Sequence, residues 1–219
     1  MRLHLSLTRN NSIVPFDHIP TLAGALHKWL GPENPWHHNV SLYSFSWLMG
    51  GTKHNGGLSF ESGARWFISS FDPHLLKTLI SGIQKDPTIN YGLAVRSITI
   101  QEDPTFSTRQ SFLVAGPVLV KRRLGDRIHH FVYMDEESDK LLTETLITKL
   151  RSAGLDSEGV RVAFDRNYTS SKTKIVSYNG IQNRASLCPI IVEGTPEQIA
   201  FAWNVGVGNS TGIGFGALN

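Results

Sequence analysis

Cysteine is almost absent from the sequence: Cys188 is the only one in 219 residues. A single cysteine excludes an internal disulfide and a zinc site built from several thiolates, and it suits a reducing compartment. No apolar run reaches membrane-spanning length, and the first residues alternate between apolar and polar instead of forming a basic segment followed by an apolar one. We therefore expect a cytoplasmic protein that does not associate with a membrane.

Several sequence motifs of enzymes are missing as well. There is no HExxH, no acidic cluster with the spacing of a two-metal site, and no Gly-Lys-Ser or Gly-Lys-Thr of a P-loop. Cys188 belongs to an apolar strand pattern with Ile190 and Val192, which is typical of a buried thiol and not of a nucleophile. We predict that the protein uses no metal and no other cofactor.

A strong excess of one charge is also missing. Lys and Arg number 21 against 18 Asp and Glu, which gives a net charge of +3 at pH 7. This mild basic excess permits a polyanionic partner without requiring one. With 40% hydrophobic and 18% charged residues the chain is typical of a soluble globular protein, and its length suits two small domains.

The first half of the sequence has the pattern of an α+β domain. Leu3, Leu5 and Leu7 alternate with polar residues, as in a strand with one buried face. Asp72-Pro73 has the residues that commonly begin a helix. The expected elements are strand 2–7, helix 20–30, strands 42–49 and 64–69, a helix from residue 72, and strand 92–100. This βαββαβ order is the ferredoxin-like arrangement.

The second half repeats this order loosely. The expected elements are a hairpin of strands 111–120 and 128–134, helix 137–151, strands 160–164, 174–178 and 187–192, and a helix that starts at the capping box Thr195-Pro196-Glu197-Gln198. We therefore predict the α+β class, with two tandem ferredoxin-like (βαββαβ, RRM-like) domains at residues 1–103 and 109–219. A linker at residues 101–108 joins them.

A loop with five glycines follows the last helix, at residues 206–216, and we call it the glycine-rich loop. Glycine accepts backbone angles that other residues avoid and lets the chain approach a ligand closely, so such a loop can expose N–H groups to an anion such as phosphate. Dinucleotide-binding loops and P-loops follow a strand and open a helix, whereas this loop leaves a helix. We expect Gly208 and Gly214 to need a positive φ or a close approach to the ligand.

The loop carries a resemblance to a known family. Gly206-Val207-Gly208, five residues, then Gly214-Phe215-Gly216 resembles the C-terminal glycine-rich loop of the CRISPR-associated pre-crRNA-processing endoribonucleases, the sixth Cas protein family of the RAMP superfamily. Residues 1–7, 22–27 and 42–46 are similar to that family's first strand, first helix and following strand, and the middle of the chain is similar only weakly. The resemblance implies that CRISPR repeat RNA (pre-crRNA) binds across a cleft between two domains.

Two segments are candidates for RNA contacts. The resemblance implies contacts along the glycine-rich loop, at Gly206, Gly208, Asn209, Ser210, Gly212, Gly214 and Gly216. The densest basic run lies in the predicted hairpin and consists of Lys121, Arg122, Arg123 and Arg127. Such a hairpin could grip A-form RNA through its phosphates, or it could be a solvated edge that prevents strand addition, and the sequence favours neither.

Histidines are the candidate catalytic residues. Imidazole titrates near neutral pH, which suits it to move a proton onto or off a ribose oxygen. Members of the resembling family carry an essential histidine between the first helix and the second strand, and some use a tyrosine or a second histidine on that helix. His27 falls on the helix position, and His37 or His38 falls on the loop position. Without the resemblance, His27 would be read as an ordinary exposed or hydrogen-bonded histidine of a helix.

The resemblance implies a metal-independent cleavage. The ribose 2′-hydroxyl attacks the adjacent phosphate and leaves a 2′,3′-cyclic phosphate and a 5′-hydroxyl. We assign His27 as the base and His38, or alternatively His37, as the acid, and the two labels can be exchanged. Lys28 or Lys53 would help to neutralise the phosphate, although a solvated lysine is the usual case.

A binding protein is the rival interpretation. A non-catalytic RAMP-type subunit that holds crRNA in a CRISPR effector complex would keep the glycine-rich loop and the basic hairpin but would not need the histidines. A third interpretation, a ferredoxin-like homodimer with no nucleic acid, does not account for the loop. Association with an effector complex and homodimer formation both stay open.

Overall fold

The computed structural model describes residues 1–33, 35–36 and 40–219. Its N-terminal half is built on an antiparallel sheet of four strands, in the order β3-β6-β1-β7. These strands are β1 (Arg2–Leu7), β3 (Tyr43–Phe45), β6 (Arg65–Ser70) and β7 (Val95–Gln101). With one helix after β1 and one after β6, this is the order of a ferredoxin-like sheet, as the sequence predicts.

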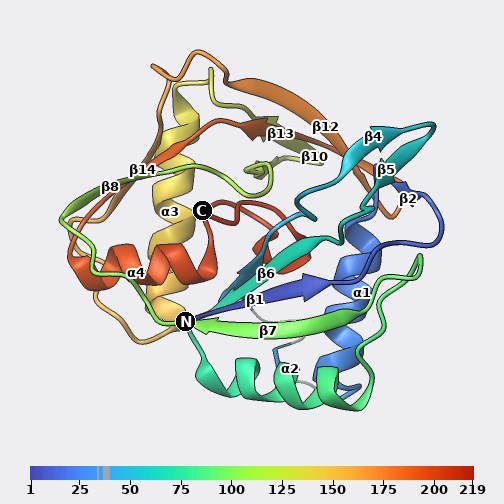
Figure 1. Ribbon diagram of the computed structural model, residues 1–219. Coiled ribbons are helices and arrows are strands. Elements are labelled where there is room, and N and C mark those ends of the chain that lie inside the picture. The colour runs from blue at the N-terminus through green and yellow to red at the C-terminus, as the bar shows by residue number, and fades with distance from the viewer. Residues whose placement is uncertain (34, 37–39) are drawn as a thin grey trace.

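Two helices cover one face of this sheet, α1 (Ile19–Leu30) and α2 (Pro73–Lys85) (Figure 1). Leu3, Leu5 and Leu7 point from β1 into the core that these helices close, and each is at most 1% exposed. The start of α2 is the predicted one, because the carboxylate of Asp72 accepts a hydrogen bond from the backbone N–H of His74.

The predicted strand at residues 42–49 is shorter than expected. The pairing with β6 is interrupted at Trp47, whose backbone N–H donates to the carbonyl of Ala115 in the C-terminal half, 3.0 Å away, and only a single bridge, from Met49 to Arg65, follows. The chain then forms a small separate sheet in the order β2-β5-β4, whose strands are β2 (Val14–Pro15), β4 (Thr52–His54) and β5 (Gly57–Ser59).

The C-terminal half has a three-stranded antiparallel sheet in the order β11-β14-β8. Its elements are β8 (Arg109–Phe112), α3 (Glu137–Ser152), β11 (Arg161–Phe164), β14 (Ile190–Glu193) and α4 (Pro196–Val205). The fourth strand of a ferredoxin-like sheet is reduced to one bridge between Val114 and Leu218. The capping box predicted at Thr195 is present, with both of its hydrogen bonds to Gln198.

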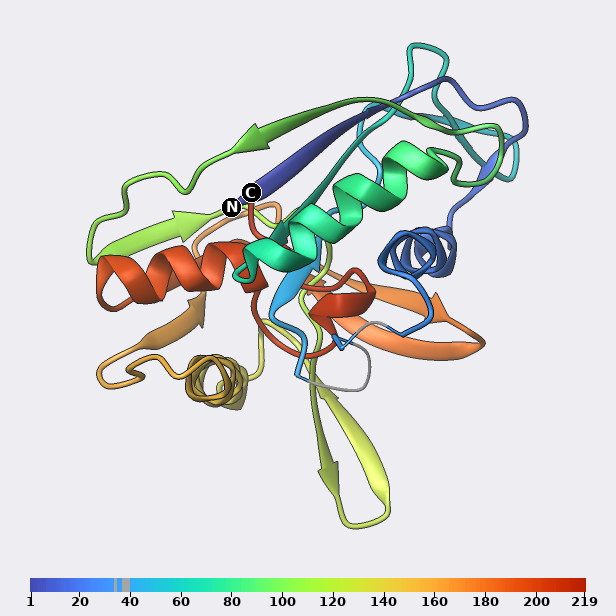
Figure 2. The same ribbon diagram turned by 90° about the horizontal axis from the view of Figure 1, so that it is seen from below.

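Two hairpins are added to this half, β9 (Val120–Leu124) with β10 (Arg127–Phe131) and β12 (Lys172–Tyr178) with β13 (Ile181–Leu187). The β9–β10 hairpin, yellow-green in Figure 2, projects from the body of the molecule. The predicted strand at 111–120 is split in two, since Gly116-Pro117 interrupts it and proline has no N–H for a ladder.

The two halves are packed against each other. The core of the N-terminal half includes four buried side chains from the C-terminal half, Leu119, Val176, Ala185 and Phe215. Arg2 on β1 is 2% exposed, and its guanidinium lies between the rings of Phe67 and Trp203, 3.9 and 3.7 Å from their centroids. It also donates to the carbonyl of Leu218, 2.7 Å away, and burial lowers the pKa of Arg2 to about 9.

In the described part of the chain, no helix combines the length and the apolar composition that a membrane crossing needs. The segment at residues 102–107, between β7 and β8, has neither helix nor strand. The domain boundaries at 103 and 109 stay a prediction.

Candidate nucleic-acid interface

The glycine-rich loop leaves α4 and contains a short 3₁₀ helix, η1 (Thr211–Ile213), that contacts both α1 and β3. Gly208 has φ +73° and Gly214 has φ +89°, so the predicted positive φ values are confirmed. A Cβ on Gly208 would lie 2.5 Å from the carbonyl oxygen of Leu119, and one on Gly214 would lie 2.7 Å from the Cγ2 of Ile19. The close approach that these glycines permit is therefore an approach to the protein itself.

Hydrogen bonds hold the loop between the two halves. The indole N–H of Trp47 donates to the carbonyl of Gly214 (2.9 Å), and the backbone N–H of Asn209 donates to that of Leu119 (2.7 Å). The five glycines expected to contact RNA are all buried, at positions 206, 208, 212, 214 and 216. Asn209 and Ser210 are partly exposed, so RNA can reach the loop at these two residues without moving the chain.

Lys149 of α3 lies beneath this loop and is 4% exposed. Its ammonium group donates to the carbonyls of Val205 and Gly206, both at 3.1 Å, and to the hydroxyl of Thr211 at 2.9 Å. No carboxylate pairs with it among the described residues, and burial lowers its pKa to about 7. The sequence analysis missed Lys149, although its spacing from Leu142 and Leu146 places it on the buried face of the helix.

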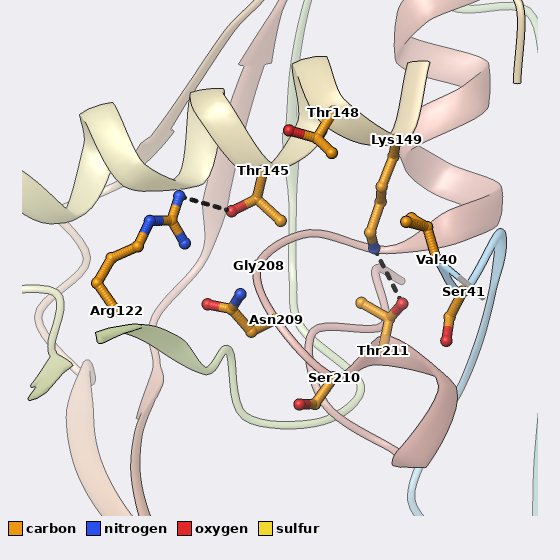
Figure 3. A pocket seen from close by; sticks show the side chains of 10 residues that line it. All are labelled: Val40, Ser41, Arg122, Thr145, Thr148, Lys149, Gly208, Asn209, Ser210 and Thr211. Carbon is orange, nitrogen blue, oxygen red and sulfur yellow. Dashed lines mark hydrogen bonds between the residues drawn. The ribbon is translucent and has the colours of Figure 1, made fainter. Parts of the chain in front are cut away.

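A pocket of about 390 Å³ opens between α3 and the glycine-rich loop. Figure 3 shows that its walls come from four segments, namely α3, residues 208–211 of the loop, residues 40–41, and Arg122 of β9. The guanidinium of Arg122 donates to the Glu144 carboxylate at 3.3 Å and to the Thr145 hydroxyl at 3.4 Å. Both cations of the pocket, Arg122 and Lys149, therefore reach it from the C-terminal half.

The basic residues of the β9–β10 hairpin lie partly at its base and partly near its tip. Lys121 and Arg122 are partly buried at the base, where the backbone N–H of Lys121 donates to the side chain of Asn209 (2.8 Å). Arg123 and Arg127 are exposed near the tip. The structure thus brings the base of the predicted hairpin into contact with the predicted loop.

Of the candidate catalytic histidines, His27 can be placed. It is half-buried on α1, the helix that contacts η1. His37 and His38 lie outside the described residues. His27 is thus on the helix of the N-terminal half that touches the glycine-rich loop.

The two candidate lysines lie in different surroundings. The ammonium of Lys28 donates to the Asp86 carboxylate (2.8 Å) and to the Thr88 carbonyl (2.6 Å), so it links α1 to the residues that follow α2. Lys53 is exposed on β4, in the small separate sheet. Neither lines the pocket beside the glycine-rich loop.

Tyr43 lies under η1, where its hydroxyl donates to the carbonyl of Gly212 at 3.4 Å. It is 3% exposed, and burial raises its pKa to about 12. Tyr43 therefore packs in the core beneath the loop. Within the described ranges, no three His, Cys, Asp or Glu side chains are grouped so that they could hold a metal ion.

The family of this chain follows from its match to a protein-family model. The model of CRISPR associated protein Cas6, C-terminal, matches residues 101–219, which is more than half of the chain and includes the glycine-rich loop. The chain belongs to the Cas6 family. The resemblance seen at both ends of the sequence is therefore confirmed, and so are the two tandem ferredoxin-like units. No curated protein matches the chain.

Solved structures of Cas6 proteins extend this similarity over the whole chain. A Cas6-related protein of Pyrococcus furiosus superimposes with a TM-score of 0.86 at 20% identity, covering 100% of this chain and 97% of that one. A RAMP protein described as binding different RNA substrates gives a TM-score of 0.84, 20% identity, and coverage of 100% and 98%. Thermus thermophilus Cse3, bound to an RNA representing a pre-cleavage complex, gives 0.53 and 13%, with coverage of 100% and 98%. At these identities the likeness concerns the fold.

Proposed function

We propose that this Cas6-family protein is a metal-independent endoribonuclease that cleaves CRISPR repeat RNA within pre-crRNA. The ribose 2′-hydroxyl attacks the adjacent phosphorus while the bond to the 5′-oxygen of the next nucleotide breaks. The products are a 2′,3′-cyclic phosphate and a 5′-hydroxyl. Membership of the Cas6 family supports the substrate, and the observation that carries the reaction is a half-buried histidine on α1, the helix packed against the glycine-rich loop.

Two proton transfers are needed for this reaction. In our proposal His27 takes the proton of the attacking 2′-hydroxyl, and His38, or alternatively His37, gives a proton to the leaving 5′-oxygen. The reverse assignment satisfies the same balance. The sequence position of His38, between α1 and β3, supports its role, because the resembling family carries an essential histidine in that region.

The negative charge on the phosphate also needs compensation. Lys28 and Lys53 stay candidates, but Lys28 would have to give up its ion pair with Asp86 to act. We further propose that the partly exposed loop residues Asn209 and Ser210, together with the basic hairpin, hold the RNA. Arg123 and Arg127 are exposed where the hairpin projects from the body, which suits contacts with the phosphates of A-form RNA.

A non-catalytic RAMP-type crRNA-binding subunit is the second candidate. It is favoured by the likeness to a RAMP protein that binds different RNA substrates. The loop and the hairpin serve either function equally. Only the histidines separate the two candidates, because a binding subunit has no use for a paired acid and base.

One experiment tests both candidates. The purified protein is incubated with the repeat RNA of its host, with and without excess EDTA, beside an unrelated RNA of equal length. We expect a single cut in the repeat RNA, unchanged by EDTA, with a cyclic phosphate on the upstream product. A repeat RNA with one 2′-deoxy nucleotide upstream of the cut should bind within a few-fold of the normal affinity, because one net hydrogen bond contributes only about 0.5–1.5 kcal/mol, and should not be cut there.

Three results would change the proposal. Tight binding without any cleavage would make the protein the binding subunit. A magnesium requirement of the chemical step, or cleavage at the 2′-deoxy position, would point to an activated water in place of the 2′-hydroxyl. Absence of binding to the repeat RNA would overturn both candidates.

A further inference from the structure

We propose that the pocket between α3 and the glycine-rich loop binds one phosphodiester group of the RNA, with Arg122 and Lys149 supplying the positive charge. This inference rests on the proposed function, because it takes the ligand from the RNA. It adds a site on the side of the loop that faces α3, and it assigns the electrostatic role to two residues of the C-terminal half.

The shape of the pocket suits a group larger than a water molecule. Its volume of about 390 Å³ lies within the range of small-ligand sites and leaves room for a phosphate with part of its ribose. Val40 and Thr148 on its rim are exposed, so an RNA backbone can enter from solvent. The partly exposed Asn209 and Ser210 line the same pocket, which therefore continues the part of the loop that RNA can reach.

The amino group of Lys149 is held in place by the loop and has no carboxylate partner among the described residues. Three oxygen atoms, from Val205, Gly206 and Thr211, accept its hydrogen bonds, and none of them belongs to a carboxylate. A buried charge is screened much less than an exposed one. An anion in the pocket would therefore favour the ammonium form of Lys149 and gain from its field, without breaking the bonds that hold the loop.

Arg122 is the donor that can bind the anion directly. Its contacts with Leu141, Glu144 and Thr145 are 3.3–3.4 Å long and the one with the Lys121 carbonyl is 3.1 Å, all longer than the 2.7–2.9 Å typical of charge-assisted hydrogen bonds. A phosphate oxygen can therefore compete for the guanidinium. The hydroxyls of Thr145 and Thr148 are less suited to the role, because they already donate to carbonyls of their own helix, at 2.7 and 2.9 Å.

The test couples one residue of the protein to one phosphate of the RNA. Repeat RNAs carry a neutral methylphosphonate at one position each, together with a 2′-deoxy nucleotide at the cleavage site, so that binding is measured without cleavage. We expect one methylphosphonate to weaken binding to the wild type about tenfold and to have little further effect on Arg122→Gln. Arg122→Gln should also reduce the slope of log affinity against log salt by about 0.7–0.9, the value for one phosphate contact.

Arg161→Gln is the control, since Arg161 carries the same charge, is exposed on β11, and belongs neither to the pocket nor to the basic hairpin. It should leave the sensitivity to that methylphosphonate unchanged. Arg122→Lys keeps the charge and should recover part of the sensitivity. If the methylphosphonate profile of Arg122→Gln is the same as that of the wild type, the pocket binds no phosphate of the RNA and the inference is wrong.

A second measurement keeps the inference testable if the repeat RNA does not bind at all, which would overturn the proposed function instead. Inorganic phosphate is then titrated into the wild type and Arg122→Gln at constant ionic strength, and the backbone amide signals of Asn209, Ser210 and Thr211 are followed by NMR. Saturable shifts in the wild type alone would support a phosphate site here. Equal shifts in both proteins, or none, would overturn it.

Discussion

The two halves of the molecule share one strand order but complete it to different degrees. The N-terminal half has all four strands, whereas the C-terminal half has three strands and a single bridge at Leu218. Where a full fourth strand would follow α4, the C-terminal half has the glycine-rich loop, which packs on β3 and α1 of the other half. The unfinished sheet therefore provides the segment that joins the halves and borders the pocket.

The halves also differ in the environment of a lysine on one of their helices. Lys28 on α1 is exposed and paired with Asp86, whereas Lys149 on α3 is buried and has no carboxylate partner in the described ranges. The candidate histidines lie in the N-terminal half, and the cations of the pocket and the hairpin lie in the C-terminal half. Under the proposed function, the first half would therefore perform the proton transfers and the second half would hold the RNA.

The largest expected effect tests the chemical role of the N-terminal half. His27→Ala should lower the single-turnover cleavage rate by about a hundredfold or more, the scale for losing a general acid or base, and should leave RNA affinity nearly unchanged. His38→Ala should behave in the same way, with His37→Ala as the alternative. His74→Ala, which removes an exposed histidine from α2, is the control and should cut at the wild-type rate. Wild-type cleavage by all three of the first variants would refute the assignment.

The next effect concerns the stability that the C-terminal half gains from Lys149. Lys149→Met leaves three buried oxygen atoms without their donor, and we expect it to lower the free energy of unfolding by about 2 kcal/mol at pH 7. Lys28→Met removes an exposed ion pair and should have a clearly smaller effect. Urea denaturation of both variants measures the difference. Equal losses would show that the buried lysine does not hold the loop.

The pH dependence of stability sharpens the same contrast. Burial lowers the pKa of Lys149 to about 7 in the folded protein, against 10.5 for an ordinary lysine. Between these values the unfolded chain holds more protons at this residue than the folded chain, so the contribution of Lys149 to stability rises with pH from about 7 towards 10. The free energy of unfolding of the wild type, measured relative to Lys149→Met, should therefore increase between pH 7 and 9. A flat difference would mean that Lys149 keeps an ordinary pKa in the folded state.

The smallest effect tests the hairpin of the C-terminal half. Replacing Arg123 and Arg127 together by Gln should weaken RNA binding about tenfold at moderate salt and reduce the salt slope by about 1.4–1.8, the value for two phosphate contacts. The cleavage rate at saturating RNA should not change. A slower rate at saturation would show that the hairpin also positions the reacting phosphate, and the separation of roles between the halves would fail.

Local signals in the sequence predict much of this fold. The helix start at Asp72-Pro73, the capping box at Thr195 and the positive φ of Gly208 and Gly214 all depend on a few neighbouring residues. The ends of strand 42–49 and the break in strand 111–120 were missed. The break in strand 111–120 falls at Gly116-Pro117, a local signal that the prediction overlooked, whereas the interruption of strand 42–49 involves a contact between the halves, the hydrogen bond from Trp47 to Ala115, which no local pattern contains.

In the candidate site, too, the features with a local signal were predicted and those that depend on distant contacts were not. The glycine-rich loop, the basic hairpin and His27 can be found from residue types and spacing. The pocket cannot, because its walls are brought together from four separate parts of the chain. Lys149 was partly predictable. Its spacing from Leu142 and Leu146 indicates burial, but only the structure shows that its amino group donates to the start of the glycine-rich loop.

The position of Arg2 has a consequence for the order of synthesis. Synthesis runs from the N-terminus, so the carbonyl of Leu218 that accepts the hydrogen bond of Arg2 is made 216 residues after Arg2 itself. At a translation rate of about 5–20 residues per second, β1 is therefore complete many seconds before Leu218 is added to the chain. During that time the guanidinium of Arg2 can stay hydrated, and a nascent chain that has not reached Leu218 cannot yet form this one of the contacts between the two halves.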